Sequence, residues 1–63
     1  MRRRAEVVER LGGTTVVDDE KGLRHFLRGL NKTSASVGTK GWIEYRSTPS
    51  LGLWYFEQPK EGD

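Results

Sequence analysis

The sequence lacks cysteine altogether and contains only one histidine and two prolines. The absence of cysteine excludes disulfide bonds and metal sites built on thiolates, and it suits a reducing compartment. No apolar run approaches the roughly 18 residues needed to cross a bilayer. The basic start, MRRRAEVVERLGG, has no apolar stretch behind it, so we do not expect it to act as a secretory signal. We expect a cytoplasmic protein with no membrane partner.

A chain of 63 residues is expected to form one small domain, residues 1–63, with frayed ends at 1–4 and 59–63. Such a chain buries roughly 60% of its unfolded surface, so its core is thin. Without disulfides or a metal, small domains commonly gain stability from a partner or from oligomerisation. A partner protein or a homodimer is therefore expected to contribute.

Positive charge is concentrated in the middle of the chain. The formal net charge is only +2. Residues 21–46, however, contain six lysines and arginines against one acidic residue, Glu44, which leaves a local charge of +5. A field of this kind attracts phosphate groups or an acidic protein surface.

The first half of the chain predicts two helices and one strand. Residues 2–11 carry valine and leucine at helical spacing and end at Gly12-Gly13. Residues 14–17, TTVV, are typical of a strand. Residues 18–31 predict a second helix that begins at capping aspartates. Its apolar residues recur at i, i+3, i+4 and i+7, as Leu23, Phe26, Leu27 and Leu30.

A hairpin that turns across residues 19–22 is the alternative to this second helix. We predict the helix, because the alternation that a strand requires fails at Phe26-Leu27. Residues 31–41 are small and polar and predict a loop, with a short strand near 34–37 as an alternative.

The second half of the chain predicts an aromatic hairpin. Residues 42–46 and 53–57 alternate in the manner of strands, and a turn lies near Thr48-Pro49. Alternation within the hairpin predicts a core face, packed against the second helix, and an opposite face that is exposed unless the first helix covers it. The core face holds Ile43, Tyr45, Trp54 and Phe56, and the opposite face holds Trp42, Leu53 and Tyr55.

These elements predict an α+β domain in the order α-β-α-β-β, with two helices on a three-stranded antiparallel sheet. The arrangement resembles an abbreviated winged-helix domain in which the hairpin of residues 42–57 is the wing and one helix is missing. The resemblance concerns the fold and carries little functional weight.

Catalysis is not expected. The single imidazole, His25, has no nucleophile or orienting carboxylate placed beside it by the sequence. There is no phosphate-binding glycine loop of the Walker or dinucleotide type, and no spaced set of metal ligands. We therefore expect no enzyme, no metal and no cofactor.

The leading hypothesis is a small accessory or regulatory protein that binds DNA or RNA. The basic face of the second helix would hold phosphates, and aromatic side chains of the hairpin would stack on bases. The small size is in keeping with a compact genome such as that of a phage or plasmid. The candidate contact residues are Lys21, Arg24, Arg28, Lys32, Lys40, Trp42, Arg46 and Tyr55.

The alternative is a protein-interaction module, an inhibitor or adaptor that binds a larger macromolecular machine through its aromatic patch. A third hypothesis is a structural protomer whose open sheet pairs with a second copy. The surface discriminates between the first two. A continuous positive face favours nucleic acid, whereas an apolar patch rimmed by mixed charge favours a protein partner.

Overall fold

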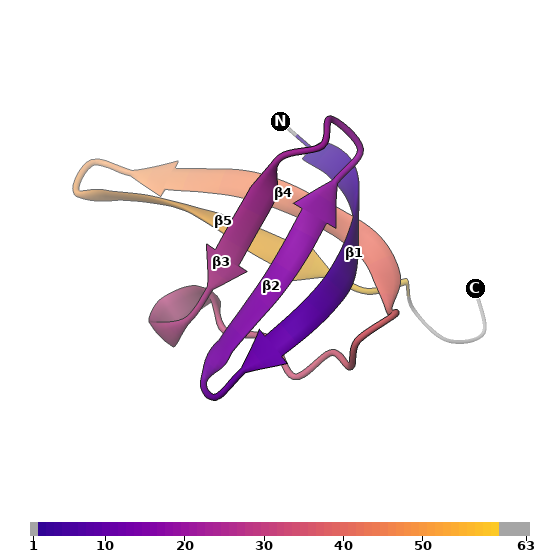
Figure 1. The fold of residues 1–63 in the computed structure, drawn as a ribbon. Coiled ribbons are helices and arrows are strands. Elements are labelled where there is room, and N and C mark those ends of the chain that lie inside the picture. The colour runs from indigo at the N-terminus through magenta and orange to yellow at the C-terminus, as the bar shows by residue number, and fades with distance from the viewer. Residues whose placement is uncertain (1, 60–63) are drawn as a thin grey trace.

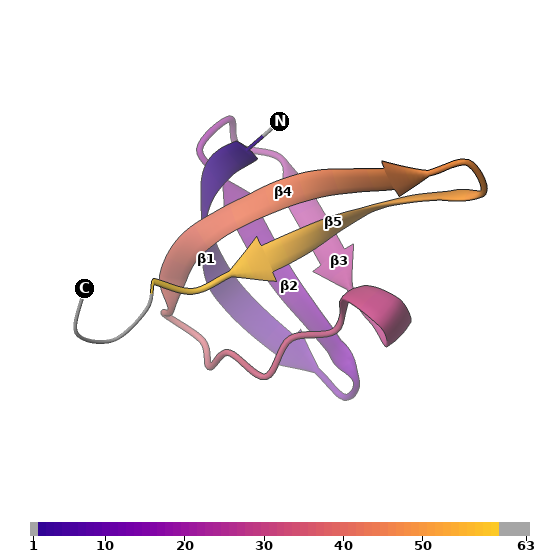
Figure 2. The ribbon, with the colours of Figure 1, turned by 180° about the vertical axis from the view of Figure 1, so that it is seen from behind.

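The computed structural model describes residues 2–59, which form a nearly all-β domain. One antiparallel sheet of five strands, in the order β3-β2-β1-β4-β5, curls into a half-barrel (Figures 1 and 2). A 3-10 turn, η1 (Gly29–Asn31), follows the third strand. The strands are β1 (Arg2–Leu11), β2 (Thr14–Asp19), β3 (Arg24–Leu27), β4 (Lys40–Thr48) and β5 (Leu51–Glu57).

The α+β prediction is wrong, and the winged-helix resemblance fails with it. The predicted first helix is the central strand, β1, which pairs with both β2 and β4. Ala5 and Val7 point inward by alternation and are buried. A bulge between Val7 and Glu9 inserts Val8 and shifts the register of β1 against β2. The extra residue places two valines next to each other, so the apolar pattern of residues 7–11 has the spacing of a helix instead of the alternation of a strand. The start of β1, expected to be frayed, is paired with β4.

The predicted second helix is also wrong, and the hairpin alternative is confirmed. β2 and β3 pair antiparallel, and the turn between them contains Gly22 at a φ of +83°. The two adjacent apolar residues Phe26 and Leu27 do not break the alternation of β3, because their side chains point to opposite faces of this edge strand. Leu27 points into the core and is 1% exposed, whereas Phe26 points outward and is 59% exposed. Residues 34–37 contain no strand.

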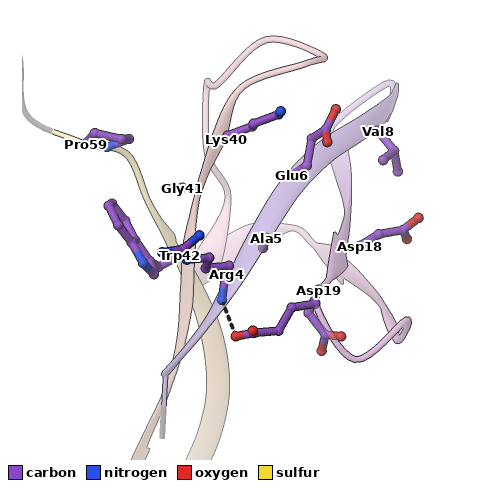
Figure 3. Close-up of a pocket in the computed structure, with 11 residues that line it drawn as sticks. Arg4, Ala5, Glu6, Val8, Asp18, Asp19, Lys40, Gly41, Trp42 and Pro59 are labelled. Atoms are coloured by element: carbon purple, nitrogen blue, oxygen red, sulfur yellow. Dashed lines mark hydrogen bonds between the residues drawn. The ribbon is translucent and has the colours of Figure 1, made fainter.

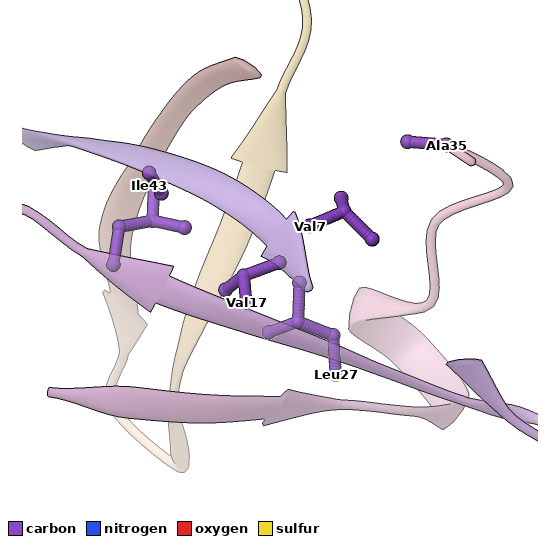
Figure 4. Packing of buried hydrophobic residues seen from close by; sticks show 6 residues of the cluster. Val7, Val17, Leu27, Ala35 and Ile43 are labelled. Atoms are coloured by element: carbon purple, nitrogen blue, oxygen red, sulfur yellow. The ribbon is translucent and has the colours of Figure 1, made fainter. Parts of the chain in front are cut away.

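The core lies on the concave side of the half-barrel (Figure 4). Trp54 and Phe56 of β5 pack against it, so the inward face predicted for the hairpin is confirmed at these positions. Tyr45 shares this face but is 45% exposed. No helix covers the hairpin within residues 2–59. The buried hydrophobic residues of the core cluster are Ala5, Val7, Val17, Leu27, Ala35 and Ile43.

The predicted aromatic hairpin is confirmed as β4 and β5, which pair from Trp42–Glu57 out to Thr48–Leu51. β1 accompanies β4 only as far as Glu44. The outer part of the hairpin, residues 45–54, therefore extends beyond the rest of the sheet (Figures 1 and 2). We call this segment the hairpin arm.

Replacing Gly41 by alanine is expected to lower the free energy of unfolding by about 2–3 kcal/mol, because a Cβ there would overlap the backbone carbonyl of Glu57. Gly52→Ala should cost less, about 1 kcal/mol, because its Cβ would meet only the movable ring of Tyr45. Gly13→Ala is the control, since no atom lies within 4 Å of its Cβ position. Urea unfolding followed by tryptophan fluorescence measures all three. Equal effects at Gly41 and Gly13 would contradict this packing.

Candidate functional site

The side of β1, β4 and β5 that points away from the core is the outer face. Strand alternation brings its side chains together, and no helix covers them within the described residues. Its aromatic and leucine side chains are half-buried. The outer face includes Arg2, Arg4, Lys40, Trp42, Glu44, Arg46, Leu53, Tyr55 and Glu57.

Arginine side chains lie over both aromatic rings of the outer face. The guanidinium carbon of Arg2 lies 4.9 Å from the ring centre of Trp42. That of Arg46 lies 4.9 Å from the ring centre of Tyr55. Each cation–π contact is worth about 0.5–1 kcal/mol at an exposed site. The outer face thus presents two stacks close together, one of Arg2 on Trp42 and one of Arg46 on Tyr55.

Ion pairs connect the two stacks. Glu57 lies 3.7 Å from Arg2 and 3.6 Å from Arg46, and Glu44 lies 3.2 Å from Arg46. The hydrogen bond from Arg46 holds the pKa of Glu44 below its usual value. Exposed pairs of this kind add little stability. Their consequence is that the outer face carries mixed charge in place of a continuous positive field.

Four of the eight residues predicted from the sequence share the outer face, namely Lys40, Trp42, Arg46 and Tyr55. The other four do not form the expected stripe, because the helix that would align them does not exist. Lys21 lies in the turn between β2 and β3. Arg28 comes immediately before η1, and Lys32 comes immediately after it. Arg24 on β3 donates two hydrogen bonds to Asp18, at 2.9 and 3.2 Å.

Four charged outer-face residues were not among the contact residues predicted from the sequence: Arg2, Arg4, Glu44 and Glu57. Their roles depend on strand register, since Arg2 lies opposite Glu44 only when residues 2–6 form a strand against β4. The alternation of residues 42–46 and 53–57 was the available signal for Glu44 and Glu57. The run of three arginines at residues 2–4 was the available signal for Arg2 and Arg4, but only the register with β4 places them on this face.

A groove of about 480 Å³ crosses β1 next to Trp42. Trp42 and Pro59 lie on one side of it and Asp18 on the other (Figure 3). It is lined by both signs of charge, with Arg4 and Lys40 among the basic residues, and its acidic residues are Glu6, Asp18, Asp19 and Glu20. The outer face therefore continues past Trp42 into a concave surface that is also of mixed charge.

A second polar cluster lies on the concave side, centred on the fully buried carboxylate of Asp19. It accepts hydrogen bonds from Arg3 Nη1 at 3.2 Å and from the backbone N–H groups of Lys21 and Leu23 at 2.8 and 3.0 Å. Asp19 Oδ2 also lies 2.8 Å from Nε2 of His25. Burial raises the pKa of Asp19, but hydrogen bonds from His25, the two backbone groups and Arg3 outweigh it and hold that pKa far below its usual value.

His25 therefore does have a carboxylate beside it, that of Asp19, which the sequence alone did not reveal. The two are six residues apart, and the β2–β3 turn brings them together. The His25 ring also packs 5.1 Å from the ring of Trp54. Through these contacts the cluster joins β1, β2, β3 and β5 at one end of the half-barrel. Among residues 2–59, no group of three or more histidine, aspartate or glutamate side chains is arranged to hold a metal.

No protein-family model, curated protein or solved structure matches the chain. Within residues 2–59, no helix has the length and apolar character needed to cross a membrane. The surface itself is therefore the basis for any assignment of function.

Replacing Asp19 by alanine is expected to lower the free energy of unfolding at pH 7 by about 3 kcal/mol, since removing one member of a buried charged cluster strands the others. The folded-state pKa of Asp19 lies below its unfolded value of about 3.9. Its contribution is therefore present above that value and is lost progressively as the pH falls from that value toward the lower folded-state pKa. The difference between wild type and variant should shrink from pH 7 to pH 2 in urea unfolding.

Asp18→Ala is the matched control, because the carboxylate of Asp18 is 37% exposed and pairs with Arg24, whereas that of Asp19 is fully buried. It should lose much less stability than Asp19→Ala at pH 7. A difference for Asp19→Ala that stays constant from pH 7 to pH 2 would contradict the electrostatic role of Asp19.

Proposed function

We propose that the protein is a protein-interaction module that binds a larger partner protein through the outer face. The observation that carries the proposal is the placement of Trp42 and Tyr55, each stacked with an arginine, on one face that no helix covers in the part of the chain that the structure describes. Tryptophan, tyrosine and arginine are the residue types most enriched among interface hot spots. Both rings are held in place before binding, which lowers the entropic cost of association.

The charge pattern supports a protein partner over nucleic acid. Arg2 and Arg46, the cations nearest the aromatic rings, are both paired with carboxylates. Glu44 and Glu57 lie between the two stacks, where they would repel a phosphate backbone. Alternating charge of this kind suits a protein surface of complementary pattern and adds specificity.

Binding of single-stranded DNA or RNA is the second candidate. It is supported by the half-buried rings of Trp42 and Tyr55 beside arginines, since stacking is worth about 1–3 kcal/mol per base. It requires the Arg46 ion pairs to open so that the guanidinium can meet a phosphate. The role as inhibitor or adaptor, the cytoplasmic location and the absence of catalysis stay predictions.

Capture from an extract of the source cell tests the proposal. Immobilised wild-type protein is expected to retain one stoichiometric protein at about 0.3 M salt, where screening removes most long-range attraction. The Trp42→Ala/Tyr55→Ala variant should retain at least about tenfold less, because truncated hot-spot residues dominate binding energy. Phe26→Ala is the matched control, since Phe26 is an exposed aromatic on β3 outside the outer face.

Equal capture by the double variant and wild type would contradict the proposal. Retention that nuclease treatment abolishes would instead support nucleic-acid binding. A gel-shift titration over a salt series then checks that candidate, because counterion release makes such binding fall steeply with salt.

A further inference from the structure

The hairpin arm leaves one strand edge without a neighbour. β1 pairs with β4 only along Lys40–Glu44, whereas β4 pairs with β5 as far as Thr48. On its β1 side, the segment 45–48 of β4 has no strand beside it among residues 2–59. A two-stranded hairpin is marginally stable by itself, and a third strand is its usual completion.

The backbone of Ser47 points toward this open edge. In an antiparallel ladder, the N–H and C=O of one residue point to the same side, and successive residues alternate. Val7 N–H donates to Thr39 O at 2.9 Å, so Val7 faces the β4 side of β1. Arg3, four residues earlier, faces the same side and lies opposite Ile43. Ile43 and, four residues later, Ser47 therefore direct their backbone groups toward the β1 side.

The opposite edge of the hairpin supports the same assignment. Asn31 Nδ2 donates to Trp54 O at 2.7 Å, so Trp54 directs its backbone groups away from β4. Its partner across the hairpin, Tyr45, must then direct its own away from β5. The contact also means that η1 covers part of the β5 edge, whereas nothing within residues 2–59 covers the β4 edge of the arm.

None of the usual devices protects the β4 edge of the arm. Residues 45–48 contain no proline and no bulge. Their single charge, on Arg46, is already bound to Glu44 and Glu57. Edge strands without such protection tend to pair with another strand.

We propose that the protein partner contributes an extended segment that pairs with β4 along residues 45–48, in line with β1. This inference rests on the proposed function. The segment is expected to be uncharged and rich in β-branched residues. Tyr45, Ser47 and Thr48 are uncharged, and Arg46 already forms ion pairs with Glu44 and Glu57, so residues 45–48 do not require a charged partner residue. Pairing along an edge supplies backbone hydrogen bonds, and the adjoining outer face supplies side-chain specificity. Arg46 belongs to both surfaces, so one partner can engage them together.

Ser47→Pro is the variant that tests this edge. It removes the edge N–H and spares the β4–β5 ladder, because Ser47 points away from β5. Ser47→Ala is the matched control, since it keeps the N–H. The probe is a phage-displayed library of random peptides of about twelve residues, long enough for one strand, selected on the wild-type protein. A selected peptide, made synthetically, is then titrated against each variant.

Ser47→Pro is expected to weaken binding by about tenfold, the equivalent of one or two backbone hydrogen bonds, while Ser47→Ala binds as wild type does. The amide hydrogen of Ser47 should also exchange more slowly in the wild-type complex. This second measurement decides the question if Ser47→Pro fails to fold.

Unchanged binding by Ser47→Pro, or a library that yields no binding peptide, would overturn the inference. Peptides that require Trp42 but not Ser47 would leave the proposed function standing and the edge inference refuted. If sedimentation shows self-association that Ser47→Pro abolishes, the occupant is a second copy, and a partner segment is excluded.

Discussion

A chain of 63 residues can bury only a small core, and the core cluster of this five-stranded sheet lies on one face. The sheet meets this constraint by curling, so that its concave side encloses Val7, Val17, Leu27 and Ile43. Among residues 2–59, no helix or second sheet covers the outer face. Its large side chains are shielded by arginines from neighbouring strands instead of by a core. The exposed aromatic surface follows from the size of the chain as well as from its sequence.

The same constraint explains which parts of the fold the sequence predicts. In the hairpin of residues 42–57, one side chain in two faces the core, so alternation is regular. The core face was assigned correctly at Ile43, Trp54 and Phe56, and the opposite face at Trp42, Leu53 and Tyr55. In β1 the bulge at Val8 breaks the alternation, and in β3 an exposed Phe26 next to a buried Leu27 imitates a helix. Local patterns are ambiguous where tertiary pairing bends a strand or places it at an edge.

The candidate site was predictable only in part, for a related reason. Trp42 and Tyr55 were found because they lie within the regular hairpin. The ion pair between Arg2 and Glu57 and the contact between Asp19 and His25 depend on strand register and on a turn. Counting charges along residues 21–46 indicated a positive region, but folding distributes those cations over separate elements and pairs several with carboxylates.

The two tryptophans allow the most direct test of the central claim, that the outer face is the binding surface. Trp42 lies on the outer face, whereas Trp54 packs against the core on the concave side. Indole N–H resonances of the two residues can be followed by NMR during titration with the captured partner. The account predicts that the Trp42 resonance shifts or broadens while that of Trp54 changes much less. A change confined to Trp54, or none at either residue, would contradict it.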